Sequence, residues 1–159
     1  MRAILADGEP SVRRALRVLL TQDLDMQVVC EVSGADALPR RVREVQPDLL
    51  VVDWELVADE AATALAGLRR LSPGLHIFVL GLRPEARVAA LTAGADGFAS
   101  KLDPPEETVR ALRAFAPEAP SGPVRPGMPQ PGRLGAQPLR QGTSCLLGDP
   151  SSERLNLTR

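Results

Sequence analysis

Five short apolar runs alternate along this chain with longer stretches in which apolar residues recur every three or four positions. The runs are rich in branched aliphatic residues and nearly unbroken by charge, as expected of strands that are buried on both faces of a sheet. They predict strands at residues 2–6, 27–32, 48–52, 75–80 and 96–100.

The stretches between and after these runs predict helices at residues 10–20, 35–45, 60–71, 84–94 and 105–115. In the first, Arg13, Arg14 and Arg17 take the face opposite the apolar one, which is formed by Val12, Ala15, Leu16, Leu19 and Leu20. A proline inside the second helix would kink it, so we expect that helix to begin late, with Pro39 in its first turn. Pro84 suits the first turn of the fourth helix, and Gly94 suits its end.

Five alternating strand–helix units predict an α/β fold with one five-stranded parallel sheet, helices on both of its faces and right-handed crossovers. The composition then changes abruptly after Ala116. Residues 117–159 contain eight prolines and six glycines among 43 residues and keep no hydrophobic period. Such a segment cannot bury enough apolar surface to offset the entropy lost on ordering. We therefore expect a folded domain at residues 1–116 and a disordered Pro/Gly-rich tail at residues 117–159.

Charge and composition narrow the function classes. The net charge is −1, which gives no overall field to attract nucleic acid or an anionic membrane. With one Trp, three Phe and no Tyr, the chain lacks the aromatic platforms of single-strand binders. Two isolated cysteines and one histidine do not form a zinc site, and Cys30 is expected to be a buried thiol in a strand. No run approaches a membrane span or a signal peptide, so we expect a cytoplasmic protein.

Candidate chemistry lies at the ends of three of the predicted strands. Asp7, Asp53 and Lys101 each follow one of the apolar runs, and the carboxyl ends of parallel strands share one edge where ligands bind. Two carboxylates and one ammonium at one edge suit a divalent cation and a phosphoryl group. Asp53 would act as a nucleophile toward phosphorus, Asp7 would help to hold Mg²⁺, and Lys101 would face a phosphoryl oxygen. Three ordinary polar strand ends are the alternative.

Three segments, at residues 4–10, 47–53 and 93–101, resemble the receiver domain of bacterial two-component response regulators. The resemblance covers about residues 2–115 and implies a flavodoxin-like (βα)5 fold with no enzymatic activity of its own. It implies that Asp53 is the phosphoacceptor, that Asp7 and Asp53 bind Mg²⁺, and that Lys101 senses the phosphate. Phe98 would be the aromatic residue whose packing reports the switch.

The chain departs from that family at informative positions. The family usually has two consecutive acids after the first strand, but Gly8 stands where the second acid would touch the metal, so the Mg²⁺ site is weakened unless Glu9 or Glu55 substitutes. Gly81 replaces the usual Ser or Thr and removes the switch hydroxyl. The usual Pro-Gly turn after the phosphoacceptor is also missing, so that loop is expected to differ in shape.

Two functions remain open. The first is a phosphorelay receiver that takes its phosphoryl group from a histidine kinase or phosphotransfer protein and contacts a downstream regulator protein. The second is a phosphorylation-independent pseudo-receiver that binds its partner through the face of the fourth and fifth helices. Replacement of Asp53 by Asn should abolish only the first.

Residues 117–159 contain no helix-turn-helix pattern, so direct DNA binding is not expected, and a truncated or frameshifted DNA-binding regulator is a further alternative. A phosphoryl-transfer enzyme or flavin binder is disfavoured because no phosphate-cradling loop follows the first strand.

Overall fold

The computed structural model describes residues 1–116, and the expectation of a disordered tail at residues 117–159 lies outside these described residues. The five strands are β1 (Arg2–Ala6), β2 (Gln27–Val32), β3 (Leu49–Asp53), β4 (His76–Gly81) and β5 (Gly97–Ser100). The first two have the predicted bounds. The other three begin one residue later than predicted, because their pairing begins at Leu49, His76 and Gly97.

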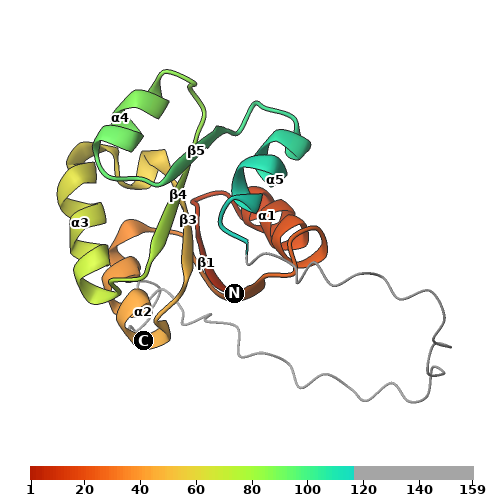
Figure 1. Ribbon diagram of the computed structural model, residues 1–159. Coiled ribbons are helices and arrows are strands. Elements are labelled where there is room, and N and C mark those ends of the chain that lie inside the picture. Colours follow the sequence, from red (N-terminus) through yellow and green to blue (C-terminus); the bar gives the residue numbers. More distant parts are fainter. Residues whose placement is uncertain (117–159) are drawn as a thin grey trace, which may run out of the picture.

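All strand pairs are parallel, and the strand order in the sheet is β2-β1-β3-β4-β5 (Figure 1). The predicted α/β architecture is therefore confirmed. Asp53 pairs with Leu80, and Gly81 pairs with Ser100, so β3, β4 and β5 end within one residue of one another along the carboxyl edge. β3 is fully buried along its whole length, which explains why its sequence shows no alternation of polar and apolar residues.

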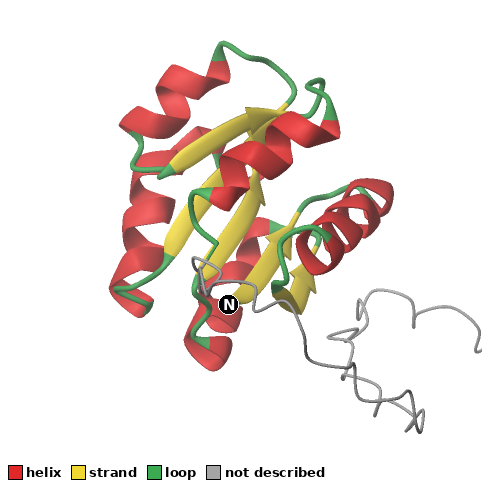
Figure 2. Ribbon diagram, turned by 45° about the vertical axis from the view of Figure 1, so that its right-hand side comes forward, coloured by secondary structure: helices red, strands yellow, loops and turns green. Residues whose placement is uncertain are grey.

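The sheet separates two hydrophobic cores. Helices α2 (Leu38–Val45), α3 (Ala61–Leu71) and α4 (Ala86–Thr92) cover one face, and α1 (Pro10–Gln22) and α5 (Pro105–Arg113) cover the other (Figures 1 and 2). Successive residues of each strand point into alternate cores, as the pleat requires. Ile4 and Leu50 belong to the first core, whereas Leu5 and Val51 belong to the second.

The helix ends follow the local chemistry that the sequence predicts, with corrections at α4 and α5. Pro39 lies in the first turn of α2, as expected. Gly94 adopts a φ of 104° just beyond α4, a left-handed conformation that suits a helix end. However, α4 begins at Ala86, because Pro84 belongs to a turn closed by the Ala86 amide on the Arg83 carbonyl. α5 ends at Arg113 rather than at residue 115.

A third correction concerns the outer face of α1. Ala15 is exposed, although its spacing predicted a buried position. Arg13, predicted to lie on the opposite, polar face, is instead partly buried and contacts the loop after β1. Among the described residues, none of the helices is long and apolar enough to cross a membrane.

Candidate functional site at the carboxyl edge of the sheet

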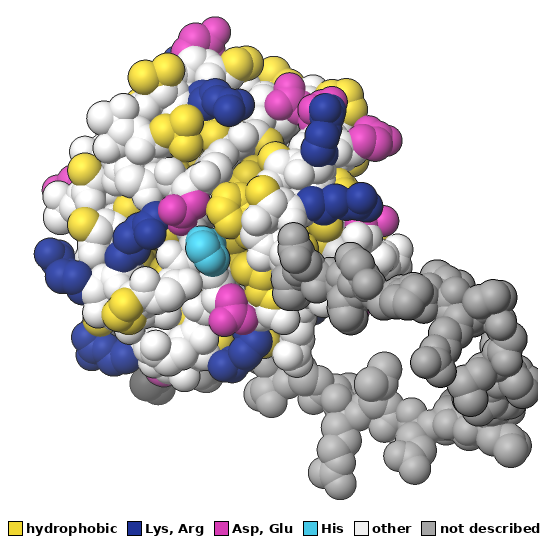
Figure 3. Space-filling view, viewed as in Figure 1, with side chains coloured by type: hydrophobic (Ala, Val, Ile, Leu, Met, Phe, Trp, Pro, Cys, Tyr) yellow, Lys and Arg dark blue, Asp and Glu magenta, His cyan; other side chains and the backbone are white. Residues whose placement is uncertain are grey.

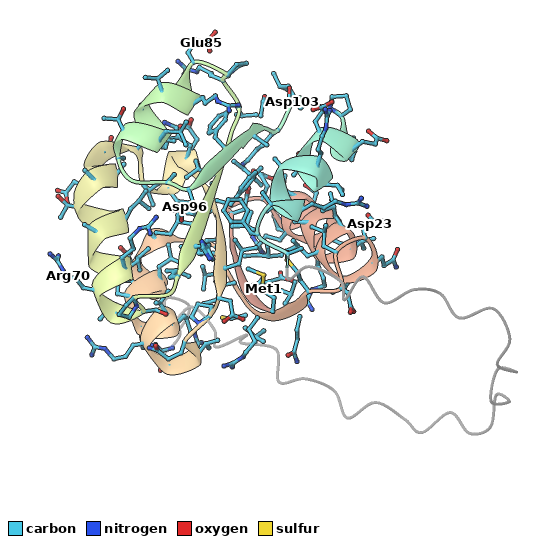
Figure 4. The ribbon with its side chains drawn as sticks, in the orientation of Figure 1. Met1, Asp23, Arg70, Glu85, Asp96 and Asp103 are labelled. Atoms are coloured by element: carbon cyan, nitrogen blue, oxygen red, sulfur yellow. The ribbon has the colours of Figure 1, made fainter. Side chains whose placement is uncertain are left out.

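Three charged side chains meet at the carboxyl edge of the sheet. The Nζ atom of Lys101 lies 2.7 Å from Oδ2 of Asp7 and 2.8 Å from Oδ2 of Asp53. The side chains of the three residues are 13%, 1% and 9% exposed, respectively. Figure 4 labels Glu85 and Asp103, which lie in the loops after β4 and β5 at this same end of the molecule. A single ammonium therefore bridges two nearly buried carboxylates.

Backbone amides hold both carboxylates in place. The amide of Glu9 donates to Oδ1 of Asp7 at 2.8 Å, and the amide of Glu55 donates more weakly to Oδ1 of Asp53 at 3.4 Å. The Lys101 amide donates to the Gly81 carbonyl at 2.8 Å, which ties the residue after β5 to the end of β4. The loops that follow the strands thus orient the charged groups that the strand ends bring together.

The pocket stabilises the charged form of Lys101. Burial alone would lower the pKa of this ammonium, but the hydrogen bonds and negative charges of Asp53 and Asp7 outweigh burial and raise the pKa above its ordinary value. Lys101 is therefore a fixed positive charge at neutral pH. It is also the only lysine among 159 residues, beside 18 arginines. The choice of lysine at this one position is a second indication, besides the strand pattern, that residue 101 belongs to the site.

The oxygen atoms at this edge fit Mg²⁺, with fewer carboxylate ligands than the sequence resemblance leads one to expect. Oδ2 of Asp7 is fully buried, and within residues 1–116 its close partner is the Lys101 ammonium, 2.7 Å away. Such an oxygen suits a cation, and Mg²⁺ in proteins commonly uses one or two carboxylates and completes its shell with water. Residues 1–116 contain no cluster of three or more metal-ligating side chains. Asp7 and Asp53 are the carboxylates at this edge that would hold such an ion.

The two unusual glycines differ in the space around them. A Cβ atom added at Gly8 would meet only the Ser33 carbonyl oxygen, at 4.0 Å, so the position has room for a side chain. A Cβ added at Gly81 would lie 3.0 and 3.1 Å from two ring carbons of Phe98 and 3.6 Å from Cβ of Trp54. Phe98 is only 7% exposed. The ring of Phe98 therefore closely approaches the space that a Ser or Thr side chain would need.

The loops beyond Asp53 form a cavity beside the site. It has a volume of about 310 Å³ and is lined by Trp54, Glu55, Arg83, Glu85 and Ala86. Trp54, which follows β3, is partly exposed and lines this cavity.

Glu9 and Glu55 contact the two acids through their backbones, and the possibility that either carboxylate substitutes at the metal site stays a prediction. Neither carboxylate pairs with Lys101 within residues 1–116. The loop after Asp53 contains two short 3-10 turns, Trp54–Leu56 and Ala58–Glu60.

The sequence analysis did not identify Arg13 as a neighbour of the site. Its Nη1 donates to the carbonyl oxygens of Asp7, at 2.6 Å, and of Gly8, at 3.3 Å. The helical spacing of α1 predicted a solvent-facing position for Arg13 and does not encode the reach of its side chain back toward the end of β1.

Comparison with known proteins gives one consistent result. Residues 3–113 match the family model of the response regulator receiver domain. The transcriptional regulatory protein KdpE of Mycobacterium tuberculosis is 35% identical over 113 residues, which cover 70% of this chain and 49% of KdpE. The nitrate/nitrite response regulator protein NarL of Escherichia coli K12 is 30% identical over 115 residues, covering 71% of this chain and 53% of NarL. The chain thus spans about half the length of these curated relatives.

Solved structures agree with these relatives. A two-component response regulator of the LuxR family from Aurantimonas sp. SI85-9A1 is 29% identical with a TM-score of 0.64, over 72% of this chain and 84% of that one. The isolated REC domain of RcsB from Salmonella enterica serovar Typhimurium, studied with the phosphomimetic BeF3−, is 28% identical with a TM-score of 0.63. That match covers 72% of this chain and 87% of the REC domain.

Proposed function

Because this chain belongs to the response regulator receiver domain family of two-component systems, we propose that its acid pocket accepts a phosphoryl group on Asp53. The observation that carries the proposal is the Lys101 ammonium, which lies within 2.8 Å of both Asp7 and Asp53. We further propose that residues 1–116 act as one receiver domain, and that they act as a signalling module rather than as an enzyme on a separate substrate.

The proposed step is a nucleophilic displacement at phosphorus. A carboxylate oxygen of Asp53 forms a bond to phosphorus while the bond between phosphorus and the donor's leaving group breaks, and the leaving group departs with that electron pair. Negative charge spreads over the transferring phosphoryl oxygens, so catalysis requires positive charge fixed nearby. Lys101 supplies it. Mg²⁺, when held by Asp7 and Asp53, would supply additional positive charge to the same oxygens.

We propose that this receiver works with a reduced pocket. Gly8 removes a carboxylate from the expected metal site, and Gly81 removes the hydroxyl that would bond the phosphoryl group. The phosphoryl donor would be a histidine kinase or a phosphotransfer protein, and the output would be a contact with a downstream regulator protein. Response regulators as a family interact with histidine kinases and downstream targets.

A phosphorylation-independent interaction module is the second candidate. The packing of Phe98 against Gly81 favours it, because the buried ring lies beside a residue that has no hydroxyl to bond a phosphoryl group. Such a module would bind its partner through α4 and α5. On α4, Val88 is 73% exposed and Leu91 is 40% exposed, and apolar side chains reach the surface over β5 and beside α5 (Figure 3).

Mass spectrometry distinguishes the two candidates. Intact mass is measured after the protein is incubated with Mg²⁺ and acetyl phosphate, with Asp53→Asn as the control. One phosphoryl adduct on the wild-type chain and none on the variant would support the receiver. A folded wild-type chain that gains no adduct from acetyl phosphate or from phosphorylated histidine kinases would contradict it and favour the interaction module.

A further inference from the structure

Asp7 lies at the start of the loop between β1 and α1. The side chain of Arg13 contacts the backbone of this loop. The amide of Asp7 donates to the Val32 carbonyl at 3.1 Å, which continues the pairing with β2. The carbonyls of Asp7 and Gly8 have no backbone donor within residues 1–116; both accept from Nη1 of Arg13. A buried backbone oxygen needs such a partner, so Arg13 satisfies the carbonyl of the buried Asp7, and it also binds the carbonyl of the exposed Gly8.

Arg13 is itself held in place by a second anchor. Its Nε lies 3.4 Å from Oε2 of Glu31 on β2, and its side chain is only 17% exposed. Arg17, one turn further along α1, also pairs with Glu31, at 2.6 Å, but contacts neither loop carbonyl within the described residues. The planar guanidinium of Arg13 can donate in several fixed directions at once, which lets one side chain join α1, β2 and the loop after β1.

Gly8 makes this fixation important in this chain. A glycine has more backbone freedom than any other residue, and nothing packs closely against this one. The Glu9 amide that orients the Asp7 carboxylate lies directly after Gly8. Rotation of the peptide units on either side of Gly8 would move that amide away from Oδ1 of Asp7. By holding the carbonyls of residues 7 and 8, Arg13 restricts this rotation.

We propose that Arg13 is a positioning residue that holds Asp7 in its productive orientation through the Asp7 and Gly8 carbonyls. The loss of its side chain should loosen the Glu9 amide from the Asp7 carboxylate while the sheet stays intact. The consequence for phosphoryl transfer rests on the proposed function, whereas the consequence for the loop does not. Mutation of a residue that orients a metal-binding or reacting group typically lowers metal affinity or activity by roughly tenfold to a hundredfold.

The test compares Arg13→Gln with Arg17→Gln, which removes a charge from the same helix and a contact from the same glutamate. Amide hydrogen exchange by NMR reports the Glu9 amide, and amides of β1 and β3 report global stability. We expect Arg13→Gln to exchange at Glu9 at least roughly tenfold faster, with the β1 and β3 amides unchanged, and Arg17→Gln to match the wild-type chain. The rate of adduct formation with acetyl phosphate is measured on the same samples.

The outcomes separate this inference from the proposed function. Faster Glu9 exchange in Arg13→Gln alone supports the positioning role, whether or not the wild-type chain gains an adduct. A wild-type chain without an adduct would then count against the proposed function only. Equal Glu9 exchange in Arg13→Gln and Arg17→Gln would overturn the positioning role. If Arg13→Gln does not fold, Arg13→Met serves instead, because it keeps the apolar stem but has no donor for the two carbonyls, and wild-type exchange at Glu9 in that variant would overturn the role equally.

Discussion

The open space at Gly8 makes the proposed loss of metal affinity reversible by one substitution. Gly8→Asp places a carboxylate directly beside Asp7, at the carboxyl edge of the sheet. No atom lies closer than 4.0 Å to the added Cβ, and the backbone of Gly8 is not in the left-handed region that disfavours side chains. The variant should therefore fold as the wild-type chain does, and its effect should be electrostatic.

The magnitude follows from Coulomb's law at an exposed position. Two unit charges 4 Å apart attract by about 1 kcal/mol in water, so a carboxylate and a doubly charged ion attract by about 2 kcal/mol. Because about 1.4 kcal/mol corresponds to a tenfold change in affinity, we expect Mg²⁺ to bind roughly tenfold to thirtyfold more tightly, the lower value reflecting screening by salt. The gain in Mg²⁺ affinity of Gly8→Asp over the wild-type chain should be larger at low ionic strength.

Trp54 allows a direct assay, because it is the only tryptophan in the chain and immediately follows Asp53. The Mg²⁺ dissociation constant is read from its fluorescence, with calorimetry as a second measure. Gly74→Asp is the matched control: Gly74 is also open to solvent, and it precedes β4 at the opposite edge of the sheet. Equal affinities in Gly8→Asp and Gly74→Asp would refute the reasoning, since they would show that a carboxylate at position 8 does not reach the ion.

Three further predictions concern stability. Gly97→Ala places a Cβ 2.6 Å from a ring carbon of Phe78, so urea unfolding should show a loss of about 1–3 kcal/mol from overpacking, and an unchanged midpoint would contradict the described packing. Gly81→Ser should cost a similar amount, about 1–3 kcal/mol, and should shift the NMR signals of the buried aromatic ring beside it; an unperturbed ring would show that the space is not filled. Lys101→Met should cost on the order of 3 kcal/mol at neutral pH, because it leaves two buried carboxylates without their cation. The folded-state pKa of Lys101 is raised, so its own ionisation contributes fully below the ordinary lysine pKa of about 10.4. That contribution is lost as pH rises through the folded value, and the difference from wild type should therefore shrink in that alkaline range.

The fold followed from the sequence because its signals are local and repeated. Strands buried on both faces require continuous apolar runs, and the helices between them require a period near 3.6, so each strand–helix unit predicts the same architecture independently. The meeting of Asp7, Asp53 and Lys101 also followed from a general property of parallel sheets, whose strands end at one edge. That argument needs only the strand direction and no detail of side-chain packing.

The remaining features of the site depend on contacts that no local pattern encodes. The filling of the space beside Gly81 depends on the rotamer of Phe98, 17 positions away, and on the register of β4 against β5. The role of Arg13 depends on how far a long side chain reaches back along its own helix toward the preceding strand. The start of α4 was misplaced because proline suits both a tight turn and a first helical turn.

The scarcity of lysine in this chain has a practical consequence. A protease specific for lysine has a single target bond among the 159 residues, between Lys101 and Leu102, and Leu102 is 74% exposed. Cleavage there would separate α5 from the five strands of the sheet. The lysine side chain must leave both carboxylates to enter a protease. The cleavage rate of the native protein therefore reports how often Lys101 separates from Asp7 and Asp53. Any ligand that holds Lys101 in the pocket should slow that rate.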